Sequence, residues 1–192
     1  MKERILTSLL TVFVISGIQA QAPSPVPKLV VGLTIDQLRA DYIEAFSALY
    51  GERGFKRLLK EGRIYTNAEY DFINVDRSSA TASIYTGTTP YYNGIPSNRW
   101  MDRGSLRIIK SVDDQDFMGV YTSESSSAKL LRCSTLSDEL KVATQGRAEV
   151  YSIAPTREMA ILAAGHAANG AFWLNDETGK WAGTSYYGDC PL

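Results

Sequence analysis

Residues 28–35 read Lys-Leu-Val-Val-Gly-Leu-Thr-Ile, and this run decides the fold class. A short, nearly continuous apolar run rich in β-branched residues is typical of a strand buried on both faces of a parallel sheet. The run ends at Asp36, and ligands of open α/β sheets bind beyond the carboxyl ends of the strands. The Asp36 carboxylate is therefore either a hard oxygen ligand for a metal or a solvated group that caps the next turn.

Helical and strand patterns alternate along the rest of the chain. The apolar spacing and the flanking Gly, Ser and Thr residues predict helices over 41–50, 55–61, 78–85, 136–143 and 157–164. The remaining apolar runs predict strands over 63–70, 106–109 and 150–153, and a hairpin over 171–184. This order predicts an α/β fold with a parallel sheet, occupying residues 28–192.

The composition is that of an ordinary globular protein. Of the 192 residues, 44% are hydrophobic, and 20 Lys and Arg stand against 21 Asp and Glu. These values argue against a disordered chain and against a nucleic-acid binder that relies on bulk positive charge. The chain has one His, His166, so it cannot build a site from several imidazoles by itself.

The first twenty residues have the pattern of a secretory signal peptide, with a charged start, an apolar run and small residues at a cleavage site. Residues 21–27 form a Pro-rich lead-in, and nothing later is apolar enough to span a membrane. We therefore expect export to the periplasm. There Cys133 and Cys190 could form a disulfide, or both could be buried free thiols.

A second candidate site lies at residues 74–87, where hydroxyl-bearing and small residues open a helix that Asp76 could cap. Backbone N–H groups at a helix start attract anions, and a hydroxyl there can act as a nucleophile. The alternative is a capped helix whose small residues allow close packing. The chain has no glycine-rich dinucleotide or P-loop motif to hold phosphates.

Five segments together resemble the alkaline phosphatase superfamily, most closely its branch of periplasmic phosphate monoesterases and type I phosphodiesterases/nucleotide pyrophosphatases. They are residues 31–42, 54–62, 85–95, 97–100 and 161–173, followed by the hairpin. The similarity spans essentially the whole chain after the leader. It implies a three-layer α/β/α sandwich with a mostly parallel sheet, of which this chain is the N-terminal part.

The resemblance also implies a mechanism. In this family two zinc ions hold an in-line displacement, and a Ser or Thr forms a covalent phosphoryl-enzyme that water then hydrolyses. Carried over by motif, Asp36 matches a zinc-ligating Asp, and Asn98 matches an Asn that donates to a phosphoryl oxygen. Asn98 could instead be a turn residue. The family's remaining zinc ligands come from sequence beyond residue 192, and His166 matches none of them.

The chain departs from the family at the nucleophile. The attacking hydroxyl of the family lies about ten residues before the Gly of the Thr86-Gly87 pair, and here that position is Arg77. A guanidinium stays protonated and cannot attack phosphorus. Ser78 would fill the nucleophile position only after a one-residue shift. We therefore favour loss of the standard nucleophile over its replacement by Ser78.

A second departure concerns the groups that hold the phosphoryl group. The family has a Lys and an Arg for the phosphoryl group in the segment before residue 161, and here Arg157 is the one candidate for contacting an anion in that segment. Arg157 could form an anion site together with Arg77. Exposed surface charge is the alternative for both arginines.

The sequence therefore predicts an exported hydrolase of phosphate mono- or diesters that requires zinc when it is full length. The alternative is a catalytically impaired relative of the same fold that binds an anionic ligand or a protein partner. The expected substrate is a small phosphorylated molecule, with no binding of nucleic-acid polymers and no membrane span once the leader is removed.

Overall fold

The computed structural model describes residues 26–188, so the leader and Cys190 lie outside it. The chain divides into two units, residues 1–32 and residues 33–192. The described part of the first unit, residues 26–32, contains no helix or strand. In the described part of the chain, no helix is long and apolar enough to cross a membrane.

Two predicted strands do not form. Residues 28–35 have no strand structure, and the side chains of Leu29, Val31 and Leu33 are 77–80% exposed. Residues 63–70 also lack strand structure, and Tyr65 is 74% exposed. A strand exists only when a neighbour pairs with its backbone, and neither segment has such a neighbour among residues 26–188. Both predictions of a strand were wrong for the part of the chain that the structure describes.

Short helices fill most of the stretch between these two segments. They are α2 (Ala40–Ala45), η1 (Ser47–Leu49) and α3 (Phe55–Glu61), which confirm the helices predicted over 41–50 and 55–61. None of their residues is buried. Their side-chain contacts include local ones, such as the Arg57–Glu61 ion pair at 2.9 Å, one turn apart on α3.

The main sheet is mixed, with strand order β3-β6-β5-β4. Its strands are β3 (Gly119–Val120), β4 (Tyr151–Ala154), β5 (Gly170–Leu174) and β6 (Trp181–Thr184). Only the β4–β5 pair is parallel, whereas β5–β6 and β6–β3 are antiparallel. The α/β class and the hairpin are confirmed, but the expected parallel majority is not present among residues 26–188. A separate antiparallel pair joins β1 (Arg99–Met101) to β2 (Ile108–Lys110), which overlaps the strand predicted over 106–109.

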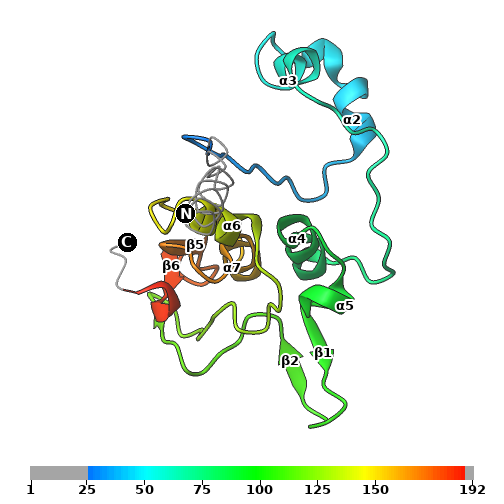
Figure 1. Ribbon diagram of the computed structural model, residues 1–192. Helices are drawn as coiled ribbons and strands as arrows, with labels where there is room; N and C mark the ends of the chain where they lie inside the picture. The colour runs from blue at the N-terminus through cyan, green and yellow to red at the C-terminus, as the bar shows by residue number, and fades with distance from the viewer. Residues whose placement is uncertain (1–25, 189–192) are drawn as a thin grey trace, which may run out of the picture. The chain divides into compact units, whose positions relative to one another are not determined.

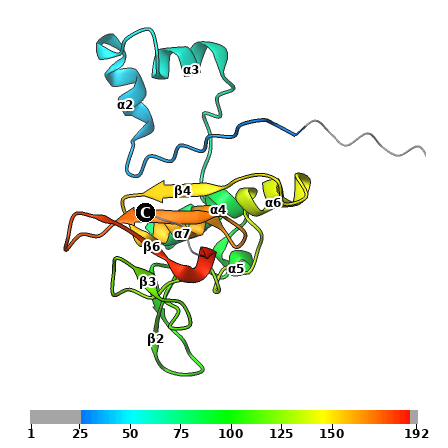
Figure 2. The same cartoon turned by 90° about the vertical axis from the view of Figure 1, so that its left-hand side faces the viewer.

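Helix α7 (Arg157–Ala164) connects β4 to β5 and covers one face of both strands (Figure 2). Side chains alternate along β5, so Ala171 and Trp173 face this helix and are each 2% exposed. On α7, Ile161 and Leu162 are fully buried in the same core. The opposite face of the sheet is open, because Tyr151 and Ile153 of β4 are 53% and 68% exposed. Residues 26–188 thus contain two of the three expected layers.

The helix layer is completed by α4 (Arg77–Thr86), the four-residue α5 (Pro90–Asn93) and α6 (Leu136–Ala143) (Figure 1). Helix α4 packs against α7, as its buried Ala82 allows. Asp76 caps α4 and Thr135 caps α6, and each also donates its own backbone N–H to the side chain of the third helical residue. These helices and caps agree with the predictions for 78–85, 136–143 and 157–164.

Candidate functional site

The candidate site is built around the N-terminus of α4, where the Asp76 carboxylate organises the chain. Its Oδ1 accepts a hydrogen bond from the Ser79 backbone N–H at 2.9 Å, and its Oδ2 accepts from Ser97 Oγ at 2.7 Å and Asn98 N at 2.6 Å. Partial burial acts to raise the Asp76 pKa, but these hydrogen bonds outweigh it and the pKa is lowered. The ionised carboxylate therefore holds Asn98 beside the helix start.

Ser78, the weaker nucleophile candidate, is fully buried. Its Oγ donates to Asn98 Oδ1 at 3.0 Å and shares a hydrogen bond with Ser111 Oγ at 3.1 Å. Asn98 is an exposed residue, and because its side-chain carbonyl is engaged, its NH₂ group is the end left to donate to another group. That arrangement suits the predicted donor role of Asn98, whereas the Ser78 hydroxyl is buried and engaged in hydrogen bonds.

Arg77 lies next to Ser78 but points to a different partner. Its Nε donates to Asp36 Oδ2 at 3.0 Å, and the two side chains are 44% and 40% exposed. The Asp36 segment is also tied to α4 by the hydroxyls of Thr34 and Tyr85, 3.2 Å apart. The predicted metal ligand and the residue predicted to occupy the nucleophile position thus form an ion pair with each other.

A cavity of about 470 Å³ opens at this ion pair. Asp36, Asp76 and Arg77 supply its charged groups, and Tyr70, Ile84 and Met159 contribute to its walls. Burial, followed by the nearby Asp36 charge, raises the pKa of Tyr70, so this phenol stays neutral at ordinary pH. The cavity is large enough for a small ligand, and side chains of both charge signs line it.

Arg157 does not line this cavity. It is only 5% exposed, and its Nη atoms donate to Asp113 Oδ1 at 2.7 Å and to Ser126 Oγ at 3.1 Å. Glu124 lies 3.6 Å away and adds a second carboxylate. The alternative of exposed surface charge is therefore wrong for Arg157. In this structure the Arg157 guanidinium binds side chains at residues 113 and 126 and so holds α7 to that segment. Its contact with a bound anion stays a prediction.

The residues described do not fit a two-zinc centre. Between residues 26 and 188, no three His, Cys, Asp or Glu side chains are grouped so that they could hold a metal ion. Asp36 is the one predicted ligand present, and Arg77 already neutralises it.

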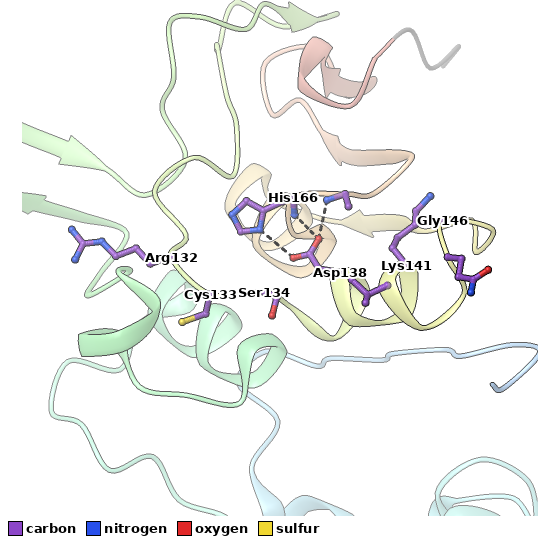
Figure 3. Close-up of a pocket in the computed structure, with 10 residues that line it drawn as sticks. Arg132, Cys133, Ser134, Asp138, Lys141, Gly146 and His166 are labelled. Atoms are coloured by element: carbon purple, nitrogen blue, oxygen red, sulfur yellow. Dashed lines mark hydrogen bonds and ion pairs between the residues drawn. The ribbon is translucent and has the colours of Figure 1, made fainter. Parts of the chain in front are cut away.

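The single histidine lies away from this site, beside α6 (Figure 3). Its ring contacts the Asp138 carboxylate and the Leu131 carbonyl. Sequence reasoning did not single out Asp138, although Thr135 three residues earlier is the signature of a helix cap. Ser111 was also missed, and no sequence signal could have found it, because its contact with Ser78 spans 33 residues of chain.

A capped helix start with an Asn beside it and a cavity lined by charged groups is an arrangement that can accommodate a small anion. Residues 30–191 match the family model of type I phosphodiesterases/nucleotide pyrophosphatases. The chain belongs to this family, which lies within the alkaline phosphatase superfamily as the motifs indicated.

Several relatives are named alkaline phosphatases. The chain is 41% identical over 164 residues to alkaline phosphatase PhoV of Synechococcus elongatus, covering 84% of this chain and 30% of that protein. It is 37% identical over 186 residues to alkaline phosphatase PafA of Elizabethkingia meningoseptica, covering 93% of this chain and 34% of that protein. The crystal structure of wild-type PafA superposes with a TM-score of 0.82 at 36% identity, over 86% of this chain and 32% of that one. The expected fold is confirmed, and the chain spans about a third of the length of these relatives.

Proposed function

We propose that the protein carrying this chain binds a small phosphate mono- or diester beside the start of α4, and that its hydrolytic activity is impaired. The observation that carries this proposal is the ion pair between Arg77 and Asp36, with 3.0 Å between Nε and Oδ2. A residue that cannot attack phosphorus occupies the nucleophile position and also engages the carboxylate expected to bind zinc.

The same ion pair gives the site a way to hold an anion. Only Nε of Arg77 donates to Asp36 within the described residues, so the two Nη groups remain available. A guanidinium presents two parallel N–H donors that match two oxygens of a phosphoryl group. The side-chain NH₂ of Asn98 would supply a further donor, because the backbone N–H of this exposed residue is held beside the helix start by Asp76.

The second candidate function is hydrolysis itself, and the family match over residues 30–191 favours it. In that case Ser78 would have to leave its buried hydrogen bonds with Asn98 and Ser111 to reach a substrate. Zinc would also have to displace Arg77 from Asp36, with its other ligands supplied from outside residues 26–188. Export to the periplasm is part of both candidates and rests on the signal-peptide pattern.

The test compares variants of the complete protein that carries this chain, with zinc present and a chromogenic phosphate monoester and diester as substrates. We expect no turnover near the usual range of about 1–1000 per second from the natural sequence. Ser78→Ala should not change this result, and Arg77→Thr should create or raise turnover. Efficient hydrolysis that Ser78→Ala abolishes would establish the hydrolase and refute the impaired binder.

Binding is measured separately by calorimetry with inorganic phosphate as the probe. Arg77→Gln should weaken phosphate binding at least about tenfold, which corresponds to one lost charge-assisted contact. Arg57→Gln is the matched control, because Arg57 is also an exposed arginine paired with a carboxylate, at 2.9 Å from Glu61. If both variants bind phosphate as the natural sequence does, the proposed site is wrong.

A further inference from the structure

The ring of His166 is held between two hydrogen-bond acceptors. Its Nδ1 lies 3.1 Å from Asp138 Oδ2, and its Nε2 lies 2.9 Å from the backbone oxygen of Leu131 (Figure 3). A neutral imidazole has one donor and one acceptor, so it can satisfy only one of these oxygens. Two acceptors require two N–H donors, and only the protonated ring has both.

The Asp138 carboxylate is held in place by backbone hydrogen bonds. Its side chain is 8% exposed and accepts from the backbone N–H groups of Thr135, His166 and Ala167 at 2.8–2.9 Å. Burial acts to raise the Asp138 pKa, but the hydrogen bonds from His166, Thr135 and Ala167 hold this pKa well below its usual range. The carboxylate is therefore ionised at neutral pH and favours a charged ring beside it.

The hydrogen bond to the Leu131 carbonyl is the one that is lost when the ring loses its proton. The segment around Leu131 lies between β3 and α6, and the next residue, Arg132, donates its backbone N–H to Asn93 O of α5 at 2.9 Å. Leu131 itself is 3% exposed. When the ring loses its proton, the remaining N–H stays with the Asp138 carboxylate, because a charged acceptor binds more strongly than a carbonyl. The Leu131 oxygen then faces a ring lone pair.

We propose that protonated His166 is a pH-dependent latch that fastens the start of α6 and the α7–β5 loop to the 128–133 segment, which contacts α5 through Arg132. When the His166 ring is protonated the latch is closed, and when the ring loses its proton at higher pH the 128–133 segment is released. The proposal is independent of what the site at α4 binds.

The groups around the ring set the pH range of the latch. Charged or titratable groups near it are Asp138 and Lys141 on α6, Arg132 and Cys133 before α6, and Tyr186 and Tyr187 after β6. Asp138 is the one anion among them. Its hydrogen bond outweighs the opposing effect of burial, so the pKa of His166 is raised above 6.5.

The direction of the pH effect follows from this raised pKa. Below the unfolded pKa near 6.5 the ring is protonated in both states, and the stabilisation is fully present. As the pH rises towards the folded pKa, the native state holds a proton that the unfolded state has lost, and stability falls. The unfolding equilibrium constant grows by up to about tenfold per pH unit across this window and levels off above it.

The ring can be observed directly, because the chain has a single His. In the NMR titration of the 192-residue chain, the Hε1 signal should have a midpoint above 6.5. The backbone amide of Arg132 should exchange faster at alkaline pH than its intrinsic rate predicts. A midpoint at or below 6.5, or unchanged Arg132 protection across the titration, overturns the proposal.

Urea unfolding between pH 5.5 and 9 provides the second measurement. His166→Gln, a neutral side chain, should remove the pH dependence in the neutral range. Cys133→Ser is the matched control, because it removes the neighbouring thiol and should leave that pH dependence unchanged. An equal slope in His166→Gln and the natural sequence would exclude the latch. If His166→Gln does not fold, the Hε1 midpoint and the Arg132 exchange of the natural chain decide the matter.

Discussion

Replacing Gly165 with Ala should be among the most damaging single-methyl changes in this chain. Gly165 has φ +76° and ψ −150°, a region of backbone space that is essentially restricted to glycine. A Cβ at this position would collide with Thr135 Oγ1 and would lie 2.5 Å from Asp138 Oδ2. Those two side chains form the reciprocal cap of α6, so the methyl group both strains the backbone and breaks the cap.

The expected cost is the sum of these two effects. The backbone strain is about 1–3 kcal/mol, and loss of the cap adds about 0.5–2 kcal/mol. Gly188→Ala is the matched control. Gly188 has φ +90° and ψ −169°, but among the described residues nothing lies within 4 Å of the point that its new methyl group would occupy.

The measurement is urea unfolding of both variants at neutral pH. Gly165→Ala should be less stable than Gly188→Ala by about 0.5–2 kcal/mol, the contribution of the cap alone. Equal free energies of unfolding for the two variants would refute the reasoning, because the strain would then explain everything and the contact with Asp138 would contribute nothing.

Two further predictions concern the start of α4 and the core. Asp76→Ala removes the cap and the acceptor for Ser97 and Asn98, and should cost about 1–2 kcal/mol at pH 7. Because the folded pKa of Asp76 is lowered, this contribution is present above the unfolded pKa near 4 and should shrink as the pH falls below it, in urea unfolding at pH 7 and pH 3. Ile161→Val in the fully buried core should cost about 0.5–1.5 kcal/mol. Ile108→Val on β2, where the side chain is 66% exposed, should change thermal stability by less than about 0.5 kcal/mol.

The helices and the hairpin could be predicted because their signals are local. Helix α6 has its cap at Thr135 and its apolar residues within two turns, and α7 has a continuous buried face. The strand predicted over residues 28–35 failed for the opposite reason. An apolar run indicates that a segment is suited to burial, but the neighbour that would pair with its backbone is a non-local property.

The candidate site likewise has features that the local sequence predicts and others that depend on residues far apart in the chain. The cap at Asp76 follows from the residue types around it, and Arg77 in the nucleophile position follows from counting along a motif. The pairing of Arg77 with Asp36 spans 41 residues and could not be read from either segment. The burial of Arg157 depends on carboxylates at residues 113 and 124, which carry no sequence signal that connects them to α7.

Strand β4 has a consequence for handling the chain in solution. Among residues 26–188 it is the last strand in the sheet order, and Tyr151 and Ile153 on it are largely exposed. Natural edge strands discourage intermolecular pairing with lysine, proline or a bulge, and the four residues Tyr-Ser-Ile-Ala carry neither charge nor proline. The 192-residue chain should therefore aggregate through this strand as its concentration rises. A lysine in place of Ile153 is the substitution that should keep it soluble, because it puts a charge on the exposed face without disturbing the packing of α7.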